Sequence, residues 1–187
     1  MTTGFYRLGA FHAAAVAGCL LVATLSGCGA APPATERVSE IRRLMGVPWT
    51  ITVHAESEAA GRAAIAAGFA EVARLERILS DYDPESELSR LSARAPTPHP
   101  VPVGDDLWRV LERAVAIRDA THGAFDPTIG PLTTLWRQAR RSGRLPLPDK
   151  LARAREAVGP DTLWLEPEGR AVGLRRPGMR LDLGGIG

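Results

Sequence analysis

The feature that most constrains the fold lies in the last residues of the chain. Arg180-Leu-Asp182-Leu is a strand-like run that leads directly into Gly184 and Gly185. Glycine lacks Cβ and tolerates positive φ, so a strand that ends in Gly-Gly usually brings the backbone close to something else. Because the sequence stops at Gly187, we expect these residues to be the front portion of a longer protein whose site and sheet continue further.

The N-terminus has the pattern of a secretory signal. Arg7 supplies a short positive region, residues 8–25 are apolar or small, and no acidic residue precedes Glu36. This stretch is short and alanine-rich for a membrane span, and it is typical of a cleaved signal peptide. It ends in Leu25-Ser-Gly-Cys28, which resembles a bacterial lipobox. An ordinary signal peptide with a chance cysteine is the alternative.

The lipobox predicts where the protein resides. We expect a lipoprotein signal peptide over residues 1–27, lipidation of Cys28, and a membrane tether over residues 28–43. Acyl chains hold a protein at a bilayer with about 0.8 kcal/mol per buried CH₂. The predicted location is therefore a bacterial membrane, facing the periplasm or the cell exterior. Cys19 leaves with the signal, so the mature domain has no disulfide and no thiol chemistry.

The charge of the chain gives no indication of a nucleic-acid partner. The formal net charge is only +2, and we find no basic stripe that favours nucleic acid. Lys150 is the only lysine, and the excess of arginine over lysine is more typical of a GC-rich genome than of phosphate recognition. Metal-ligating His or Cys clusters are absent from the sequence, as are Gly-rich phosphate loops and nucleophile elbows.

Hydrophobic periodicity and turn residues predict the elements of residues 44–187. Together they indicate an α+β fold with a mixed or antiparallel sheet flanked by helices, incomplete at the C-terminus. Trp136 is expected to anchor one of the helices. We predict strands at 45–54 and 179–183, a hairpin of 162–165 with 171–174, a helix over 58–79 capped by Ser57, a short turn at 85–91, a loop over 93–102, and helices from Asp105 or Asp106 to about 121, over 132–141 and over 150–158 after Asp149.

Three segments carry candidate chemistry. In residues 121–132, Pro127 forces Asp126 out of helical geometry in a loop rich in glycine and proline. In residues 79–91, Tyr82 beside a helix end could stack on a flat ligand. Asp182 before its glycine pair could meet a ligand or a metal with nearby carbonyls. Taken singly, each segment also has a plain structural reading: a helix connector, a capping turn, and a polar strand terminus.

Taken in order, these segments resemble one family. Met45-Gly, the Ser-x-Tyr-x-x-x-Ser-x-Leu-x-x-Leu run from Ser80, Gly-Ala-Phe-Asp-x-Thr-x-Gly-Pro-Leu-x-x-Leu-Trp over residues 123–136, and Leu-Asp-Leu-Gly-Gly-Ile from Leu181 are similar to motifs of the ApbE-type FAD:protein FMN transferases. The third motif is highly specific, and the spacing of all four is as expected. The resemblance covers residues 44–187, and family members are often periplasmic lipoproteins.

The resemblance implies roles for individual residues. FAD would be bound by Met45, Tyr82, Ala124, Phe125, Asp126 and Asp182. Asp126 would accept from the adenine or ribose portion, and the backbone carbonyl of Gly185 would help ligate magnesium. The family usually has asparagine where this chain has Ser92, so that polar contact is expected to differ. The main metal-binding aspartate and its threonine partner would lie beyond residue 187.

The implied reaction is magnesium-dependent transfer of FMN from FAD to a threonine hydroxyl of an extracytoplasmic acceptor protein, with release of AMP. Acceptors of the family include subunits of Rnf and of sodium-pumping NADH:quinone oxidoreductases. Three alternatives remain open: an FAD pyrophosphate hydrolase that releases FMN and AMP, a lipid-anchored flavin-binding protein without catalysis, and a truncated, non-functional product. We predict that the 187 residues alone do not transfer flavin.

Overall fold

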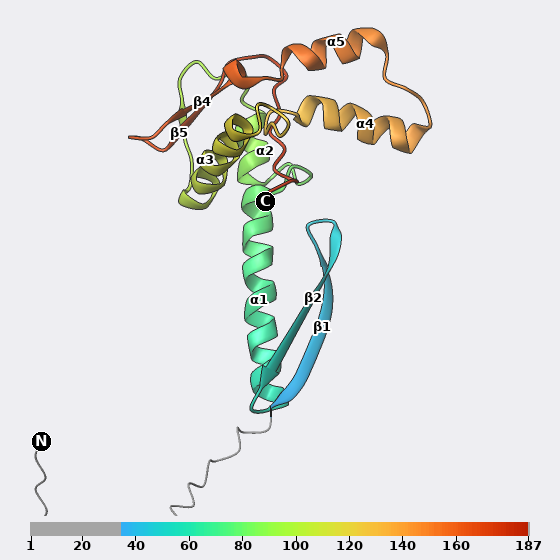
Figure 1. The fold of residues 1–187 in the computed structure, drawn as a ribbon, viewed down its shortest axis with the longest axis vertical. Coiled ribbons are helices and arrows are strands. Elements are labelled where there is room, and N and C mark those ends of the chain that lie inside the picture. The colour runs from blue at the N-terminus through green and yellow to red at the C-terminus, as the bar shows by residue number, and fades with distance from the viewer. Residues whose placement is uncertain (1–34, 187) are drawn as a thin grey trace, which may run out of the picture. The chain divides into compact units, whose positions relative to one another are not determined.

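The computed structural model describes residues 35–186 and has the α+β architecture that the sequence predicts. Within these residues, five helices accompany two small antiparallel sheets (Figure 1). None of these helices is long and apolar enough to cross a bilayer. The elements are β1 (Glu36–Leu44), β2 (Val47–Ala55), α1 (Glu58–Leu79), α2 (Glu87–Ser92), β3 (Val101–Pro102), α3 (Asp105–Ala120), α4 (Gly130–Ser142), α5 (Pro148–Glu156), a 3-10 turn (Pro160–Thr162), β4 (Leu163–Glu166) and β5 (Ala171–Leu174).

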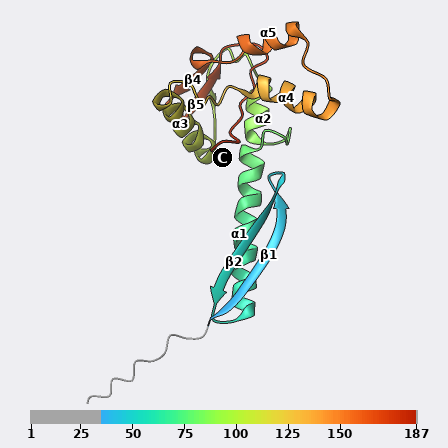
Figure 2. The ribbon, with the colours of Figure 1, turned by 45° about the vertical axis from the view of Figure 1, so that its right-hand side comes forward.

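Strands β1 and β2 form a regular antiparallel hairpin beside α1, as both views show (Figures 1 and 2). Met45 and Gly46 make the turn with φ of 51° and 75°, the left-handed geometry of a two-residue hairpin loop. A Cβ on Gly61 would lie 2.5 Å from the Val38 side chain, so glycine allows α1 to pack directly on β1. Within the segment predicted as a tether, residues 28–43, the part from Glu36 onward forms strand β1.

The second sheet has the order β3-β5-β4 and carries the predicted hairpin. β4 pairs antiparallel with β5 from Leu163 opposite Leu174 to Glu166 opposite Ala171, which confirms that prediction. The four residues of β5 are buried, and the hydrophobic core joins this sheet to α2 and α3. The predicted loop over 93–102 includes the short strand β3 at its end.

Helix starts differ from the predicted ones in a consistent way. Gly104 is the N-cap of α3 and Leu147 the N-cap of α5, so Asp105, Asp106 and Asp149 lie inside the first turns instead of capping them. Acidic side chains stabilise a first turn through the helix dipole without being caps. Ser57 does cap α1, where its side chain accepts from the Ala60 amide at 3.3 Å.

The segment over residues 179–183 is not a strand within the described residues. Its Leu181 amide donates to Ser92 Oγ at 3.1 Å, and its Asp182 amide donates to the Pro127 carbonyl at 2.9 Å. These bonds go to a helix end and a loop, so the segment runs through the core without a sheet partner there. Trp136, which is expected to anchor a helix, lies on α4 and is 52% exposed.

Candidate active site

Asp182 is the centre of a buried polar cluster. Its Oδ2 accepts from Thr133 Oγ1 at 2.8 Å and from the Arg137 guanidinium at 3.1 Å, and its Oδ1 accepts from the Gly184 amide at 2.9 Å. Only 7% of the residue is exposed. Thr133 and Arg137 are four residues apart on α4, so one face of that helix holds the carboxylate.

Arg137 joins Asp182 to the segment that follows α1. Its guanidinium also forms an ion pair with Asp81 and lies 4.3 Å from the centre of the Tyr82 ring. Partial burial lowers the pKa of Arg137, but the hydrogen bond and charge of Asp81, together with the charge of Asp182, outweigh that effect and raise it. Arg137 therefore stays charged and holds residues 81 and 82 next to Asp182.

The predicted loop over residues 121–132 lies against the same segment. Asp126 Oδ1 accepts from both the amide and the hydroxyl of Thr128, at 2.8 and 2.6 Å, in a turn local to the loop. The fully buried Thr128 hydroxyl in turn accepts from the Gly159 amide at 2.9 Å. A Cβ on Gly130 would come within 2.2 Å of the Arg180 carbonyl oxygen, so this glycine is needed where α4 meets residues 180–182.

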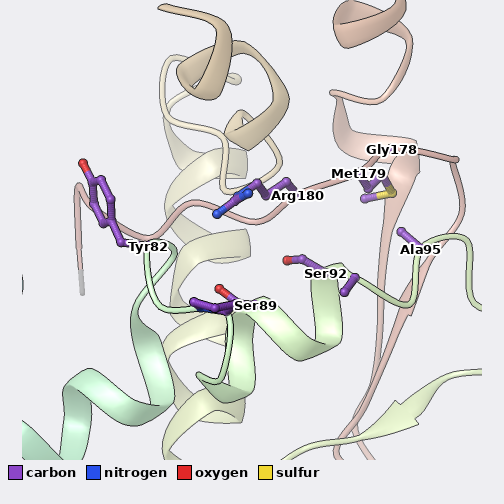
Figure 3. A pocket seen from close by; sticks show the side chains of 9 residues that line it. Tyr82, Ser89, Ser92, Ala95, Gly178, Met179 and Arg180 are labelled. Carbon is purple, nitrogen blue, oxygen red and sulfur yellow. The ribbon is translucent and has the colours of Figure 1, made fainter. Parts of the chain in front are cut away.

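Three cavities meet at Tyr82, whose side chain is exposed. The largest, about 620 Å³, runs from Tyr82 past Arg180, Ser89 and Ser92 to Met179, as Figure 3 shows. A second, about 230 Å³, is lined by Met45, Trp49, Leu79, Tyr82, Leu183 and Gly184. A third, about 190 Å³, has three arginines in its wall: Arg137, Arg141 and Arg180. The exposed ring is thus next to an apolar cavity and a cationic one.

The structure brings most of the predicted site residues together. Met45 and Tyr82 line one cavity, whose wall also includes Gly184, two residues after Asp182. A Cβ on Gly185 would lie 3.2 Å from the Phe125 ring, so these two residues are also neighbours. The Asp126 carboxylate binds within its own loop, and Ala124 is exposed. Cys28 lies outside the described residues.

Sequence reasoning missed Arg137, Asp81, Thr133 and Arg180. The hydrogen bonds of these residues join positions that are 45 to 99 residues apart in the sequence. No local sequence pattern predicts such contacts. One signal was available: Gly130, Thr133 and Arg137 follow a spacing of three and four, which is one face of a helix. Ser92, the departure from the family pattern, makes a specific contact of its own, since its hydroxyl accepts from the Leu181 amide.

The described residues do not form a metal site by themselves. Within residues 35–186, no three His, Cys, Asp or Glu side chains gather in a way that could hold an ion. Gly185 could offer a backbone carbonyl, but both oxygens of nearby Asp182 already accept hydrogen bonds. The open space at the site is instead bordered by the Tyr82 ring and by three arginines, with Asp81 in the same wall.

Solved structures share this fold. A flavin transferase ApbE from Vibrio cholerae matches with a TM-score of 0.68 and 24% identity, over 80% of this chain and 48% of that chain. An ApbE protein from Thermotoga maritima matches with a TM-score of 0.70 and 24% identity, over 81% of this chain and 48% of that one. At 24% sequence identity, these similarities show that the chain shares the fold of the two structures.

Sequence comparison defines the family. The model of the ApbE family matches residues 45–187, so the chain belongs to the ApbE family, and the predicted resemblance is confirmed. A curated relative from Treponema pallidum, named FAD:protein FMN transferase, is 32% identical over 177 residues, which is 89% of this chain and 48% of the relative. One of the same name from Klebsiella pneumoniae is 34% identical over 131 residues, which is 67% of this chain and 36% of the relative. The chain thus spans about a third to a half of these relatives.

Proposed function

We propose that this chain provides the FAD-binding part of an enzyme that transfers FMN from FAD to a threonine hydroxyl of an acceptor protein, with magnesium and release of AMP. One observation carries the proposal: Met45, Tyr82 and the segment of Asp182 surround the same open space in a member of the ApbE family. Curated relatives bear the name FAD:protein FMN transferase, which agrees with this assignment.

Asp182 would orient the nucleotide through a single remaining acceptor position. A carboxylate offers about four lone-pair sites, and three are taken by Thr133, Arg137 and the Gly184 amide. The free site is on Oδ1, because Oδ2 accepts two of these bonds. A donor N–H or O–H of the ligand would bind there, and the fixed carboxylate would hold it without a further loss of side-chain entropy.

Tyr82 and the arginines would bind the two other parts of the ligand. An exposed aromatic ring offers a face on which a flat heterocycle stacks. Arg137, Arg141 and Arg180 surround the cavity next to that ring, and guanidinium groups match phosphate oxygens in charge and geometry. A ring system on Tyr82 would therefore place a linked pyrophosphate near these three side chains.

Magnesium belongs to the proposal through the family resemblance. When bound, it would offset negative charge on the pyrophosphate. The described residues contribute at most the Gly185 carbonyl, so we assign no step of the reaction to the metal. The acceptor would be an extracytoplasmic flavoprotein such as a subunit of an Rnf or NADH:quinone oxidoreductase complex. Signal-peptide cleavage and lipidation of Cys28 would anchor the enzyme at a bacterial membrane, facing the periplasm or the cell exterior.

The binding part is tested by titrating the chain with FAD and following flavin fluorescence. We expect saturable binding that weakens at least tenfold in Tyr82→Leu and in Asp182→Asn. Trp164→Leu is a matched control, because Trp164 is also an exposed aromatic under an arginine, with Arg175 at 5.4 Å from its ring. Equal loss of FAD binding in the control and in Tyr82→Leu would contradict the assigned site.

The catalytic part is tested with the complete product of the reading frame that contains these residues. With FAD, magnesium and an acceptor that carries a threonine, we expect FMN to become attached to the threonine while AMP appears. Release of AMP and free FMN without acceptor would identify a hydrolase instead. FAD binding with no AMP under either condition would identify a flavin-binding protein.

A further inference from the structure

Positive charge is concentrated in the α4–α5 hairpin, residues 130–156. This segment contains seven Arg or Lys residues and two acidic ones, whereas the remainder of the chain has more acidic than basic residues. The basic excess of this segment is largely cancelled by the acidic excess elsewhere, so the formal net charge of +2 does not indicate a basic surface. The segment thus differs in charge from the rest of the molecule.

Six of these seven cations are unpaired within residues 35–186. Arg137 is bound to Asp81 and Asp182 at the candidate site. The other six side chains are exposed and form no ion pair with any described residue. They are Arg140, Arg141, Arg144, Lys150, Arg153 and Arg155. Their charges are therefore not neutralised by any ion pair within residues 35–186.

Large apolar side chains are exposed among these cations. Leu145 is 80% exposed, Leu147 63% and Trp136 52%. α4 fully buries only Gly130 and α5 only Ala154, so the hairpin contributes little to the core. In both views α4 runs away from the neighbouring helices and α5 returns beside it (Figures 1 and 2). Its leucines and tryptophan are therefore presented outward.

A groove between the two helices combines both properties. It has a volume of about 350 Å³, and its lining includes Leu135, Leu145, Leu147, Arg144 and Lys150. A groove whose lining combines leucines, polar side chains and two cations suits a ligand that is itself amphiphilic, with a hydrocarbon portion and a negative headgroup. An acidic protein surface would match the cations but would leave the leucines without a counterpart.

We propose that the α4–α5 hairpin docks onto an anionic phospholipid surface. Arg144, Lys150 and Arg140 would bind phosphate headgroups, and Leu145, Leu147 and Trp136 would insert at the level of the lipid interface, as basic and aromatic residues do in interfacial segments. The inference does not depend on the proposed flavin chemistry. It agrees with the proposed lipid anchor at Cys28, which would keep the hairpin close to a bilayer.

The test compares binding of the full chain to two kinds of vesicle by co-sedimentation. One is pure phosphatidylcholine, and the other contains about 30 mol% phosphatidylglycerol. Cys28→Ser removes acylation from every sample, and any attraction by residues 8–25 is common to both vesicles. The ratio of the two partition coefficients therefore isolates the response to anionic lipid. We expect a ratio well above one that falls as salt is added.

The decisive variants carry equal charge changes at different places. Arg140→Gln, Arg144→Gln and Lys150→Gln together should lower the ratio at least tenfold, since each cation near an anionic leaflet contributes severalfold. The control variant carries Arg94→Gln, Arg109→Gln and Arg113→Gln, three exposed arginines outside the hairpin. Its ratio of partition coefficients should stay within about twofold of that of the parent. Leu145→Ser with Leu147→Ser should weaken binding to both vesicles.

Two results would overturn the proposal. An equal fall in the ratio for both charge variants would mean that the effect is one of total charge. A parent ratio near one would exclude anionic membranes as the partner and leave an acidic protein surface as the alternative. All substituted side chains are exposed, and thermal unfolding followed by circular dichroism confirms that each variant is folded.

Discussion

Replacing Arg137 by leucine is expected to destabilise the fold as well as the site. The side chains of Asp81 and Asp182 are 9% and 8% exposed, and that of Arg137 is 26% exposed. The Asp81 carboxylate has Arg137 as its only hydrogen-bond donor among the described residues, whereas Asp182 keeps Thr133 and the Gly184 amide. The substitution would therefore leave one buried carboxylate without a partner.

Stranding a buried charge by removing its partner costs about 3–5 kcal/mol. Because Arg137 is a quarter exposed, we expect a value at the lower end, about 3 kcal/mol in the free energy of unfolding. For a chain of this size that corresponds to a fall in Tm of roughly 6–12 °C. Urea unfolding followed by circular dichroism measures the free energy, and a thermal melt measures Tm.

A second substitution separates the stranded charge from lost packing. Asp81→Asn in the Arg137→Leu background removes the uncompensated charge and should recover more than about 1 kcal/mol of the loss. Arg140→Leu is the matched control on the same helix, since Arg140 is exposed and forms no ion pair within residues 35–186. If Arg137→Leu and Arg140→Leu differ by less than about 0.5 kcal/mol, the reasoning is wrong.

Three further predictions concern single contacts. Gly130→Ala places a Cβ against the Arg180 carbonyl, 2.2 Å away, and should lower the free energy of unfolding by about 1–3 kcal/mol in urea titrations. Ser92→Ala leaves the buried Leu181 amide without its acceptor and should cost about 1–3 kcal/mol by the same measurement. Hydrogen bonds to Arg74 and Arg109 lower the pKa of Asp106 below its ordinary 3.8. The ionised Asp106 therefore stabilises the folded state above that pH, and this stabilisation is lost as the pH falls through the lowered pKa. The Tm deficit of Asp106→Asn should accordingly shrink on acidification below about pH 4.

Matched controls exist for all three. Gly169→Ala meets only an ordinary contact at 3.8 Å and should be nearly neutral. Ser142→Ala removes an exposed hydroxyl and should change stability by less than about 0.5 kcal/mol. Asp161→Asn alters an exposed aspartate without an ion pair in the described part of the chain, so it should change Tm little. A control that behaves like its partner would contradict the contact in question.

Elements with a strong local pattern could be predicted from the sequence. Hydrophobic periodicity over residues 58–79 predicted α1, and Ile65 and Phe69 on this helix are buried. The turn residues between β4 and β5 predicted their pairing, which the register confirms. In each case the information lies within one continuous segment, because helix periodicity and hairpin turns are local properties.

Elements that depend on a distant partner could not be predicted in the same way. β1 has the sequence Glu-Arg-Val-Ser-Glu-Ile-Arg-Arg-Leu, whose charges resemble a tether, and only pairing with β2 and packing of Val38 on α1 make it a strand. Residues 179–183 are the opposite case. Their composition predicts a strand, but the amides of Leu181 and Asp182 donate to Ser92 and Pro127 and not to a neighbouring strand. Local propensity decides neither case, since tertiary partners override it.

The candidate site follows from one face of one helix. Gly130, Thr133, Arg137 and Arg141 are spaced three, four and four residues apart, so α4 presents them as a stripe. Gly130 admits the Arg180 backbone, Thr133 and Arg137 hold Asp182, and Arg141 lines the cationic cavity. The motif over residues 123–136 ends at Trp136, one residue before Arg137. Arg137 is the side chain that connects α4 with Asp81 and Asp182. A motif marks the backbone positions that a shared fold requires, whereas the side chains that join them depend on distances only the structure supplies.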